Sequence, residues 1–219
     1  MNATTEWPTD PAEARALQTR LARKVRLGPA PESVQLIAGV DTGFADAGRT
    51  ARAAVVVMRW PGLEPVAEMV AERPTPMPYV PGLLSFRELP AVLDALERLA
   101  MTPDLVLCDG QGIAHPRRLG IAAHLGVITG FATIGVGKSR LVGTHAEPDI
   151  GKGAWAPLMD GAERIGTVLR TRAGVRPLWV SPGHRVDHDG AADWVLACCR
   201  RYRLPEPIRA ADRLASRRP

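Results

Sequence analysis

The chain is poor in cysteine and has no long hydrophobic run, and both shortages narrow the class of protein. Only three cysteines occur, two of them adjacent, so no disulfide framework is expected. Cys108 lies inside an apolar run, where we expect a small buried side chain. Aliphatic runs such as residues 53–58 are far too short to cross a bilayer, and residues 1–6 lack the pattern of a secretory signal. These shortages predict a cytoplasmic protein in a reducing compartment, with no membrane partner.

Repeats, low-complexity tracts and a linker between two cores are also missing from the sequence. A chain of 219 residues suffices for one sizeable core, so residues 1–219 are expected to form a single domain. The 28 lysines and arginines exceed the 23 aspartates and glutamates, and the pI is about 9.6. This excess fits a polyanionic partner such as nucleic acid, and it equally fits an ordinary basic soluble protein.

The apolar periodicity predicts an α/β fold that begins with three strands. Turns at Gly48 and at Pro61–Gly62 favour an antiparallel meander, and Asp10 followed by Pro11 marks the start of a first helix. A mixed β-sheet flanked by helices is therefore predicted. Helices are expected near residues 11–25, 85–100, 116–125, 191–201 and 207–216, and strands near residues 34–41, 52–60, 65–71, 105–108 and 132–136.

Two aspartates each follow an apolar run that reads as a strand. Asp41 follows residues 36–40, and Asp109 follows residues 105–108. A carboxylate at such a position is costly to bury unless it is paired or bound to metal. Either one could instead accept backbone hydrogen bonds at a turn. Together on neighbouring strands, and joined by Glu88, they predict a site for a hard divalent cation such as Mg²⁺, and hence phosphodiester chemistry.

Glu88 has a second interpretation. Residues 85–88 match a capping box, in which Ser85 caps a helix and Glu88 accepts from the backbone N–H of the cap residue. Spacing alone favours this capping role over a metal role. The two roles are compatible in different states of the site.

Lys138 lies in a segment that resembles a phosphate loop but fails its register. That loop needs glycine five places before Gly137, and Ala132 stands there. The residues after Ser139 also look extended rather than helical. We therefore reject nucleotide hydrolysis, and Lys138 is either a phosphate contact just past a strand end or a solvated lysine.

A proline-rich segment around Tyr79 is stiff and cannot be regular helix. A ring held rigidly there could act as a wedge between stacked bases, although a buried aromatic is the more frequent case. Gly82, Gly110 and Gly112 either allow close approach to a flat ligand or are merely turn residues. His115 is a phosphate contact or a structural histidine; neither it nor His184 has zinc-like spacing to the cysteines.

Six segments together resemble the Endonuclease V family of deoxyinosine-specific repair nucleases. The match extends over nearly the whole chain, and its second and third segments are long and specific. Val80 stands where isoleucine is usual and Gly137 where alanine is common, which leaves the three acidic residues untouched. The segments are residues 37–41, 78–88, 109–120, 138–141, 181–184 and 204–207.

The resemblance implies a ribonuclease-H-like fold and a DNA repair enzyme. Such an enzyme recognises deoxyinosine and hydrolyses the second phosphodiester bond 3′ to the lesion, leaving a 3′-hydroxyl and a 5′-phosphate. By this similarity Asp41, Asp109 and Glu88 bind Mg²⁺, and Mn²⁺ is expected to substitute. His115 and Lys138 are implied to complete the catalytic set near the scissile phosphate.

Further residues are expected to contact DNA. The partner implied is deoxyinosine-containing DNA, single- or double-stranded, bound by a monomer, and inosine-containing RNA stays open. The wedge comprises Pro78, Tyr79, Val80 and Pro81; the base pocket Gly82, Leu84 and Gly110; and the candidate phosphate contacts Arg117, Arg118 and Ser139.

Three other functions remain compatible with the residues. One is an inosine-specific ribonuclease, and another is a structure-selective ribonuclease-H-like nuclease that needs no lesion. The third is a non-catalytic nucleic-acid-binding module. Three carboxylates argue against that module, because binding phosphates gains nothing from them.

Overall fold

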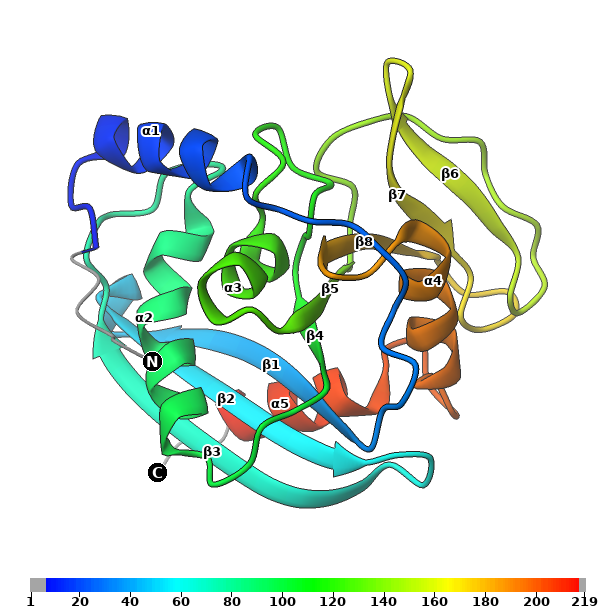
Figure 1. The fold of residues 1–219 in the computed structure, drawn as a ribbon, viewed down its shortest axis with the longest axis horizontal. Helices are drawn as coiled ribbons and strands as arrows, with labels where there is room; N and C mark the ends of the chain where they lie inside the picture. Colours follow the sequence, from blue (N-terminus) through cyan, green and yellow to red (C-terminus); the bar gives the residue numbers. More distant parts are fainter. Residues whose placement is uncertain (1–6, 217–219) are drawn as a thin grey trace.

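A single mixed sheet forms the centre of the molecule and carries helices on both faces (Figure 1). The computed structural model describes residues 7–216. The strands are β1 (Leu36–Ala45), β2 (Thr50–Arg59), β3 (Glu64–Pro74), β4 (Leu105–Asp109), β5 (Ala132–Gly137), β6 (Trp155–Asp160), β7 (Glu163–Leu169) and β8 (Leu178–His184). The helices are α1 (Pro11–Ala22), α2 (Leu84–Arg98), α3 (Ile121–Thr129), α4 (His188–Ala197) and α5 (Glu206–Ser216), with a short 3₁₀ turn, η1 (Asp46–Gly48).

The strand order is β3-β2-β1-β4-β5-β8-β7-β6. The three central strands β1, β4 and β5 are parallel, and the remaining neighbours are antiparallel. The mixed sheet flanked by helices and the antiparallel meander of β1, β2 and β3 confirm the predicted fold class.

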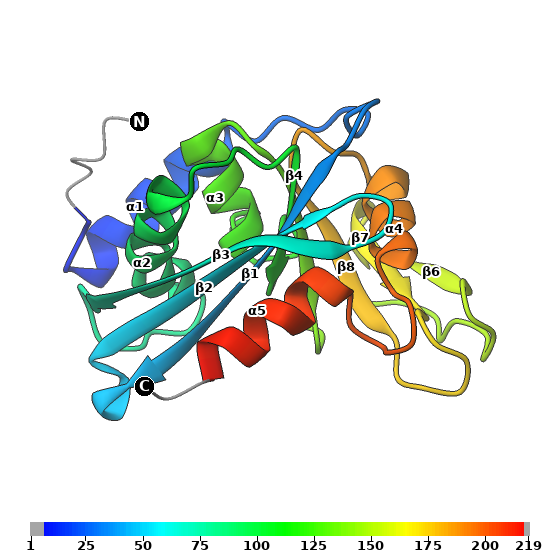
Figure 2. The same cartoon turned by 90° about the horizontal axis from the view of Figure 1, so that it is seen from below.

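Alternate residues of the central strands point into two separate cores. Ile37 of β1 packs with Ile208 of α5, whereas Val40, three residues further along the strand, packs with Leu89 of α2. Figure 2 shows α5 on one side of β1 and β2, with α1, α2 and α3 on the other. Side-chain parity along a strand therefore decides which helix layer a residue meets.

The first helix begins where the sequence predicts it. The Asp10 carboxylate accepts from the N–H groups of Ala12 and Glu13, and the helix ends at Ala22 rather than near residue 25. The other predicted helices and strands are present with shifted ends, except for the helix expected from Pro116.

That helix begins only at Ile121, so its predicted start is wrong. The backbone N–H of Arg118 donates to the His115 carbonyl oxygen, and Arg118 has a φ of 56°. This left-handed conformation closes a turn and cannot continue into an α-helix. The residues after β4 are therefore free to shape a pocket instead.

The sequence left β6, β7 and β8 unassigned. Pro157 and Gly166 lie inside these strands and weaken their sequence signal, because both residues are depleted in strands. Antiparallel pairing of β8 with β5, followed by β7 and β6, extends the sheet.

All three cysteines are free thiols and Cys108 is buried, as the sequence predicts; Cys198 and Cys199 are buried as well. Among residues 7–216, no helix combines the length and the apolar character needed to cross a membrane.

Candidate active site

Strand parity places Asp41 and Asp109 side by side on the α5 face of the sheet. Val40 pairs with Cys108 across the parallel strands β1 and β4, so the two aspartates, one residue further on, are neighbours. Both have the parity of Ile37 and Leu107, which belong to the core that faces α5. The strand β1 runs on to Ala45, so Asp41 lies within a strand rather than at its end.

A third carboxylate, Asp212, comes from α5 and was not predicted from the sequence. A Cβ atom on Gly39 would lie 2.0 Å from the carbonyl oxygen of Pro207, so glycine at this position lets α5 pack directly on β1. One carboxylate oxygen from each of Asp41, Asp109 and Asp212 lies within 4.8 Å of the others. The three acids thus meet on one face from two strands and one helix.

Lys138, just past the end of β5, places its ammonium group among these acids. Its Nζ lies 2.5 Å from Oδ2 of Asp109 and 3.9 Å from Oδ1 of Asp212. Burial opposes the charge of Lys138, but the bond to Asp109 and the charges of Asp41 and Asp212 raise its pKa. One ammonium group therefore faces three carboxylates.

The excess of carboxylates over ammonium groups affects the pKa of Asp41. Burial and the neighbouring Asp109 carboxylate raise the pKa of Asp41 to about 7, even though Lys138 acts in the opposite direction. Carboxylates that crowd in this way share protons or bind a cation. Oxygen donors are the ligands that Mg²⁺ prefers, so the three aspartates fit a magnesium ion by their chemistry.

Glu88 is not part of a capping box, so that interpretation of the sequence is wrong. The helix α2 begins at Leu84, its cap residue is Leu83, and no side chain caps it. Ser85 lies inside the helix and its hydroxyl bonds to Nδ1 of His124 instead. Burial, followed by the charges of Asp41 and Asp109, raises the pKa of Glu88 well above its ordinary value. Glu88 is thus a buried acid on the α2 side of the aspartates. It is not among the carboxylates grouped within 4.8 Å of one another, and its role as a ligand of Mg²⁺ stays a prediction.

A pocket of about 230 Å³ opens beside Glu88 and Asp109. The predicted pocket residues Gly82, Leu84 and Gly110 all line it, together with the starts of α2 and α3 and the loops after β4 and β5. Its lining residues are Tyr79, Gly82, Leu84, Ser85, Glu88, Asp109, Gly110, Gln111, His115, Leu119, Gly120, Ile121, Ser139, Arg140 and Leu141.

The carbonyl oxygen of Gly82 is fixed by three donors. Gln18 Nε2 and Arg117 Nη2 each donate to it at 3.0 Å, and His115 Nε2 does so at 3.1 Å. Gly82 has a φ of 78°, and a Cβ there would lie 2.7 Å from Arg117 Nη2. The wall of the pocket is therefore rigid main chain that only glycine fits.

His115 serves this wall in the structure. Its Nδ1 accepts from the backbone N–H of Arg117 at 3.1 Å, so Nε2 carries the proton that it donates to Gly82. Burial, helped by the charge of Arg117, lowers the pKa of His115 to about 4, which keeps the ring neutral. Both ring nitrogens are occupied, so the geometry favours a positioning role, and the catalytic role implied by the resemblance stays a prediction.

The proline-rich segment projects Tyr79 into solvent. Met77 is buried and Val80 packs beside it on the cluster that contains Leu83 and Phe86, while 61% of Tyr79 is exposed. The expectation of a buried aromatic is therefore wrong here. A rigid exposed ring at the mouth of the pocket has the shape that a wedge requires.

The predicted phosphate contacts lie in different surroundings. Ser139 is exposed at the pocket, and its carbonyl accepts from Gln111 Nε2 at 3.0 Å. Arg118 is paired with Asp160 and Glu163, each at 2.7 Å, so its charge is compensated. Arg117 is bound to Gly82. Phosphate contact by these three residues stays a prediction.

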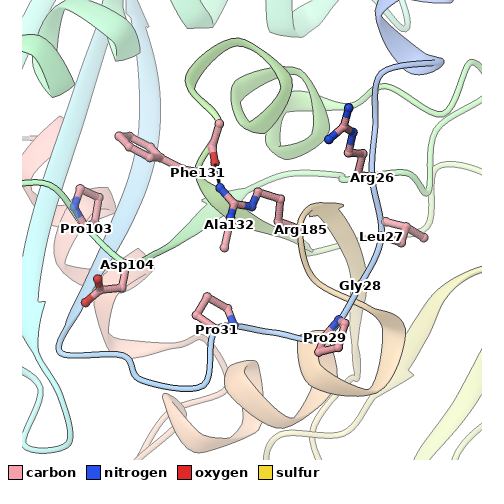
Figure 3. A pocket seen from close by; sticks show the side chains of 11 residues that line it. Arg26, Leu27, Gly28, Pro29, Pro31, Pro103, Asp104, Phe131, Ala132 and Arg185 are labelled. Carbon is pink, nitrogen blue, oxygen red and sulfur yellow. Dashed lines mark hydrogen bonds between the residues drawn. The ribbon is translucent and has the colours of Figure 1, made fainter.

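A second cavity, of about 420 Å³, lies at the amino-terminal ends of the parallel strands β4 and β5, and Figure 3 shows the residues that line it. It is bordered by residues 26–31 and by the starts of β4 and β5, where Asp104 already accepts from the N–H groups of Gln35 and Leu36. Ligands of open α/β sheets bind at the carboxyl ends of the parallel strands. The grouped acids at those ends are therefore the better candidate site.

The mixed sheet flanked by helices, with three carboxylates grouped on one face, is a ribonuclease-H-like α/β fold. The sequence profile of the Endonuclease V family matches residues 19–213. The chain therefore belongs to the Endonuclease V family and is a nuclease.

Individual relatives agree with this assignment over nearly the whole chain. Endonuclease V of Alkalilimnicola ehrlichii is 65% identical over 211 residues, which cover 96% of this chain and 93% of that protein. The crystal structure of Endonuclease V from Streptomyces avermitilis has a TM-score of 0.92 at 46% identity and covers 96% of this chain and 93% of that one. Ciona intestinalis Endonuclease V, in complex with a 24mer DNA containing an inosine followed by a ribo-adenosine, has a TM-score of 0.80 at 26% identity, covering 93% of this chain and 95% of that one.

Proposed function

We propose that this chain is a magnesium-dependent DNA repair endonuclease specific for deoxyinosine. It acts as a single-domain monomer and hydrolyses the second phosphodiester bond 3′ to the lesion, leaving a 3′-hydroxyl and a 5′-phosphate. The observation that carries the proposal is the adjacency of two features: three aspartate carboxylates within 4.8 Å of one another, and a main-chain-walled pocket that borders Asp109.

Recognition of the base follows from the walls of that pocket. Hypoxanthine pairs poorly, so its extrusion from a duplex costs less than that of a normal base. The first turn of α2 contributes Leu84 and Ser85 to the pocket, and the first N–H groups of a helix have no partner within the helix. Such donors suit the carbonyl oxygen of hypoxanthine, whereas the amino group of adenine would leave them unpaired.

In this proposal the phosphodiester bond is cleaved at the cluster of three aspartates. Asp41, Asp109 and Asp212 would hold Mg²⁺, which when bound polarises the phosphate and lowers the pKa of water. Glu88 borders both the pocket and the aspartates, and burial together with the charges of Asp41 and Asp109 raises its pKa well above its ordinary value, which suits a group that exchanges a proton during the reaction.

Lys138 is the cation that faces the scissile phosphate in this proposal. Its ammonium group is bound to Asp109 in the structure, where it compensates part of the negative charge. Neutralisation of the aspartates by a divalent cation would leave Lys138 free to donate to a phosphate oxygen and to stabilise the charge that grows there.

Substitution of Tyr79 by alanine is expected to reduce cleavage of inosine in duplex DNA more than in single strands. The exposed ring is needed only where neighbouring bases must be separated. A loss of roughly tenfold in kcat/KM on duplex is expected, since one stacking contact is worth about 1–3 kcal/mol. Tyr79→Phe keeps the ring and serves as the matched control. Equal losses on both substrates would argue against a wedge.

The metal-free protein is expected to lose stability as the pH rises from about 4 through 7. Asp41 has a raised pKa in the folded state, so the folded chain binds more protons than the unfolded chain in this range, and its free energy of unfolding falls. Each unit of pKa shift corresponds to about 1.4 kcal/mol. Urea unfolding of Asp41→Asn in chelator should show a weaker dependence on pH than wild type.

Two further measurements complete that experiment. Asp193 is an exposed aspartate on α4, and Asp193→Asn should keep the wild-type dependence on pH. Added Mg²⁺ should restore stability to the wild-type protein at about pH 8, because a bound ligand stabilises the folded state. If the free energy of unfolding depends on pH in the same way in Asp41→Asn and wild type, the claim that neighbouring carboxylates raise the pKa of Asp41 is refuted.

Base specificity tests the proposed function itself. One end-labelled strand carries hypoxanthine, adenine or guanine at the same position, in single-stranded DNA, in duplex and in RNA. Cleavage of the hypoxanthine strand alone supports the proposal. Cleavage that ignores the base would indicate a structure-selective nuclease, and cleavage of RNA alone an inosine-specific ribonuclease.

A further inference from the structure

A cluster of arginines surrounds an exposed tyrosine on the chain that leads from α4 into α5. Tyr202 is 41% exposed, the guanidinium carbon of Arg209 lies 3.3 Å from its ring centroid, and that of Arg201 lies 5.8 Å away. Arg203 is the next residue. We name the group of Arg201, Tyr202, Arg203 and Arg209 the arginine platform.

The arginine platform is joined directly to the active site. Arg203 Nη2 donates to the carbonyl oxygen of Lys138 at 3.0 Å and to that of Pro177 at 2.7 Å. Arg209 lies one turn before Asp212 on the same helix, α5. The loop that carries Lys138 and the helix that carries Asp212 therefore both border the platform.

The charge of the platform is largely uncompensated. Arg209 is paired with Glu206 at 2.9 Å, but within residues 7–216 neither Arg201 nor Arg203 lies within salt-bridge distance of a carboxylate. Burial and the neighbouring Arg176 lower the pKa of Arg203, so more positive charge lies close by. Unpaired arginines next to an exposed ring are the elements of a single-strand binding surface, where phosphates meet cations and bases stack on aromatics.

The platform lies on the same side of the sheet as the three aspartates. The pocket is built mainly from the α2–α3 side of the sheet, the three aspartates lie on the α5 face, and the platform continues from α5. A strand whose base occupies the pocket would cross the aspartates before it reaches the platform. If the cut lies 3′ to that base, the platform lies beyond the cut.

We propose that the arginine platform binds the substrate strand on the 3′ side of the scissile bond. Arg201 contacts its phosphates, Arg203 holds the platform against the loop that carries Lys138, and the exposed part of the Tyr202 ring lies beside a base. The ligand is thus the single-stranded segment that becomes the 5′-phosphate product. This inference rests on the proposed function, because that function sets the direction of the strand.

Two inosine-containing single strands test the proposal. One ends a single nucleotide beyond the expected cut, and the other continues for about 12 nucleotides, a length within the site sizes of single-strand binding folds. In Arg201→Ala the ratio of kcat/KM for the long strand over the short strand should fall roughly fivefold, since one phosphate contact and the edge of a stack are lost. The salt slope of binding to the long strand should fall by about 0.7.

Matched variants separate charge from disruption of the fold. Arg201→Lys keeps the charge and should restore most of the ratio. Arg98 is an exposed arginine in the last turn of α2, far from the platform, and Arg98→Ala should match wild type in both measurements.

The outcomes distinguish this inference from the function on which it rests. A wild-type enzyme that cuts neither inosine strand would overturn the proposed function. Wild-type cleavage of both strands, with an unchanged ratio and salt slope in Arg201→Ala, would overturn the platform alone. If the ratio of kcat/KM and the salt slope fall equally in Arg201→Ala and Arg98→Ala, the effect comes from net charge alone, and the proposed role of the platform is overturned.

Discussion

Replacing Asp41 or Asp109 with alanine is expected to lower turnover on deoxyinosine DNA by about a thousandfold or more. Each change removes one of the carboxylates that lie within 4.8 Å of one another and so removes a ligand proposed for Mg²⁺. A bound cation contributes several kcal/mol to stabilising charge in the transition state, and about 1.36 kcal/mol corresponds to tenfold in rate. Single-turnover rates with excess enzyme would measure this loss without interference from product release.

Binding of inosine DNA should survive in both variants. The pocket walls at Gly82 and Gly110 are main chain, and Gln18 and Arg117 hold the Gly82 carbonyl; Asp41 does not line the pocket, and Asp109 only borders it. Removing a negative charge should even tighten binding to a polyanion slightly. Asp193→Ala removes an exposed carboxylate elsewhere and should cut at the wild-type rate. Near-normal turnover in Asp41→Ala or Asp109→Ala would refute the proposed metal site.

Asp212→Asn is expected to reduce turnover by about a hundredfold or more, although no signal in the sequence singled out this residue. The amide keeps the size of the side chain, so packing of α5 on β1 should be preserved, while one anionic ligand is lost. The requirement for Mg²⁺ should shift to higher concentration, because the remaining pair, Asp41 and Asp109, must hold the ion alone.

The measurement for Asp212 is the cleavage rate as a function of Mg²⁺ concentration. Asp193→Asn is again the control, since it makes the same chemical change on a different helix. If the rate of Asp212→Asn equals that of wild type at every Mg²⁺ concentration, Asp212 is only a neighbour of the site. A lower rate with unchanged melting temperature would support the role of a ligand.

Much of the fold could be predicted because its signals are local. The alternation of apolar residues and the turns at Gly48 and Pro61–Gly62 identify the meander, and Asp10 identifies the first helix. Parity along β1 and β4 then places Asp41 and Asp109 on the same face, so the strand pattern is enough to predict that these two acids of the cluster meet.

The rest of the site depends on contacts between distant segments. Asp212 joins the cluster only because α5 packs on Gly39, a contact between residues about 170 positions apart that periodicity does not report. Ser85 matched a capping box, but His124 binds its hydroxyl from another helix. For Asp212 there was no local signal, and for Ser85 a tertiary contact overrode the local signal.

The turn around His115 is a second place where a prediction from local sequence failed. The sequence predicted a helix from near Pro116 to Leu125. Arg118 instead adopts a left-handed conformation, and its side chain pairs with Asp160 and Glu163 on the β6–β7 hairpin. A residue expected to hold phosphate is thus bound to strands that the sequence left unassigned.

The two faces of the sheet separate recognition from cleavage in the proposed mechanism. Glu88 and the pocket lie on the side of α2 and α3, and Asp212 comes from the opposite side. An enzyme built in this way reads one nucleotide and cuts at a bond some distance along the strand. In the proposed function, the placement of α2 and α5 on opposite faces would account for a cut that lies away from the recognised base.

The most direct test is a nicking assay on an end-labelled duplex that carries one deoxyinosine, with Mg²⁺ and with chelator. The account predicts a single nick at the second phosphodiester bond 3′ to the inosine, present only with Mg²⁺ and absent from a duplex with adenine at that position. A nick that persists in chelator, lies elsewhere, or occurs equally in the adenine duplex would contradict it.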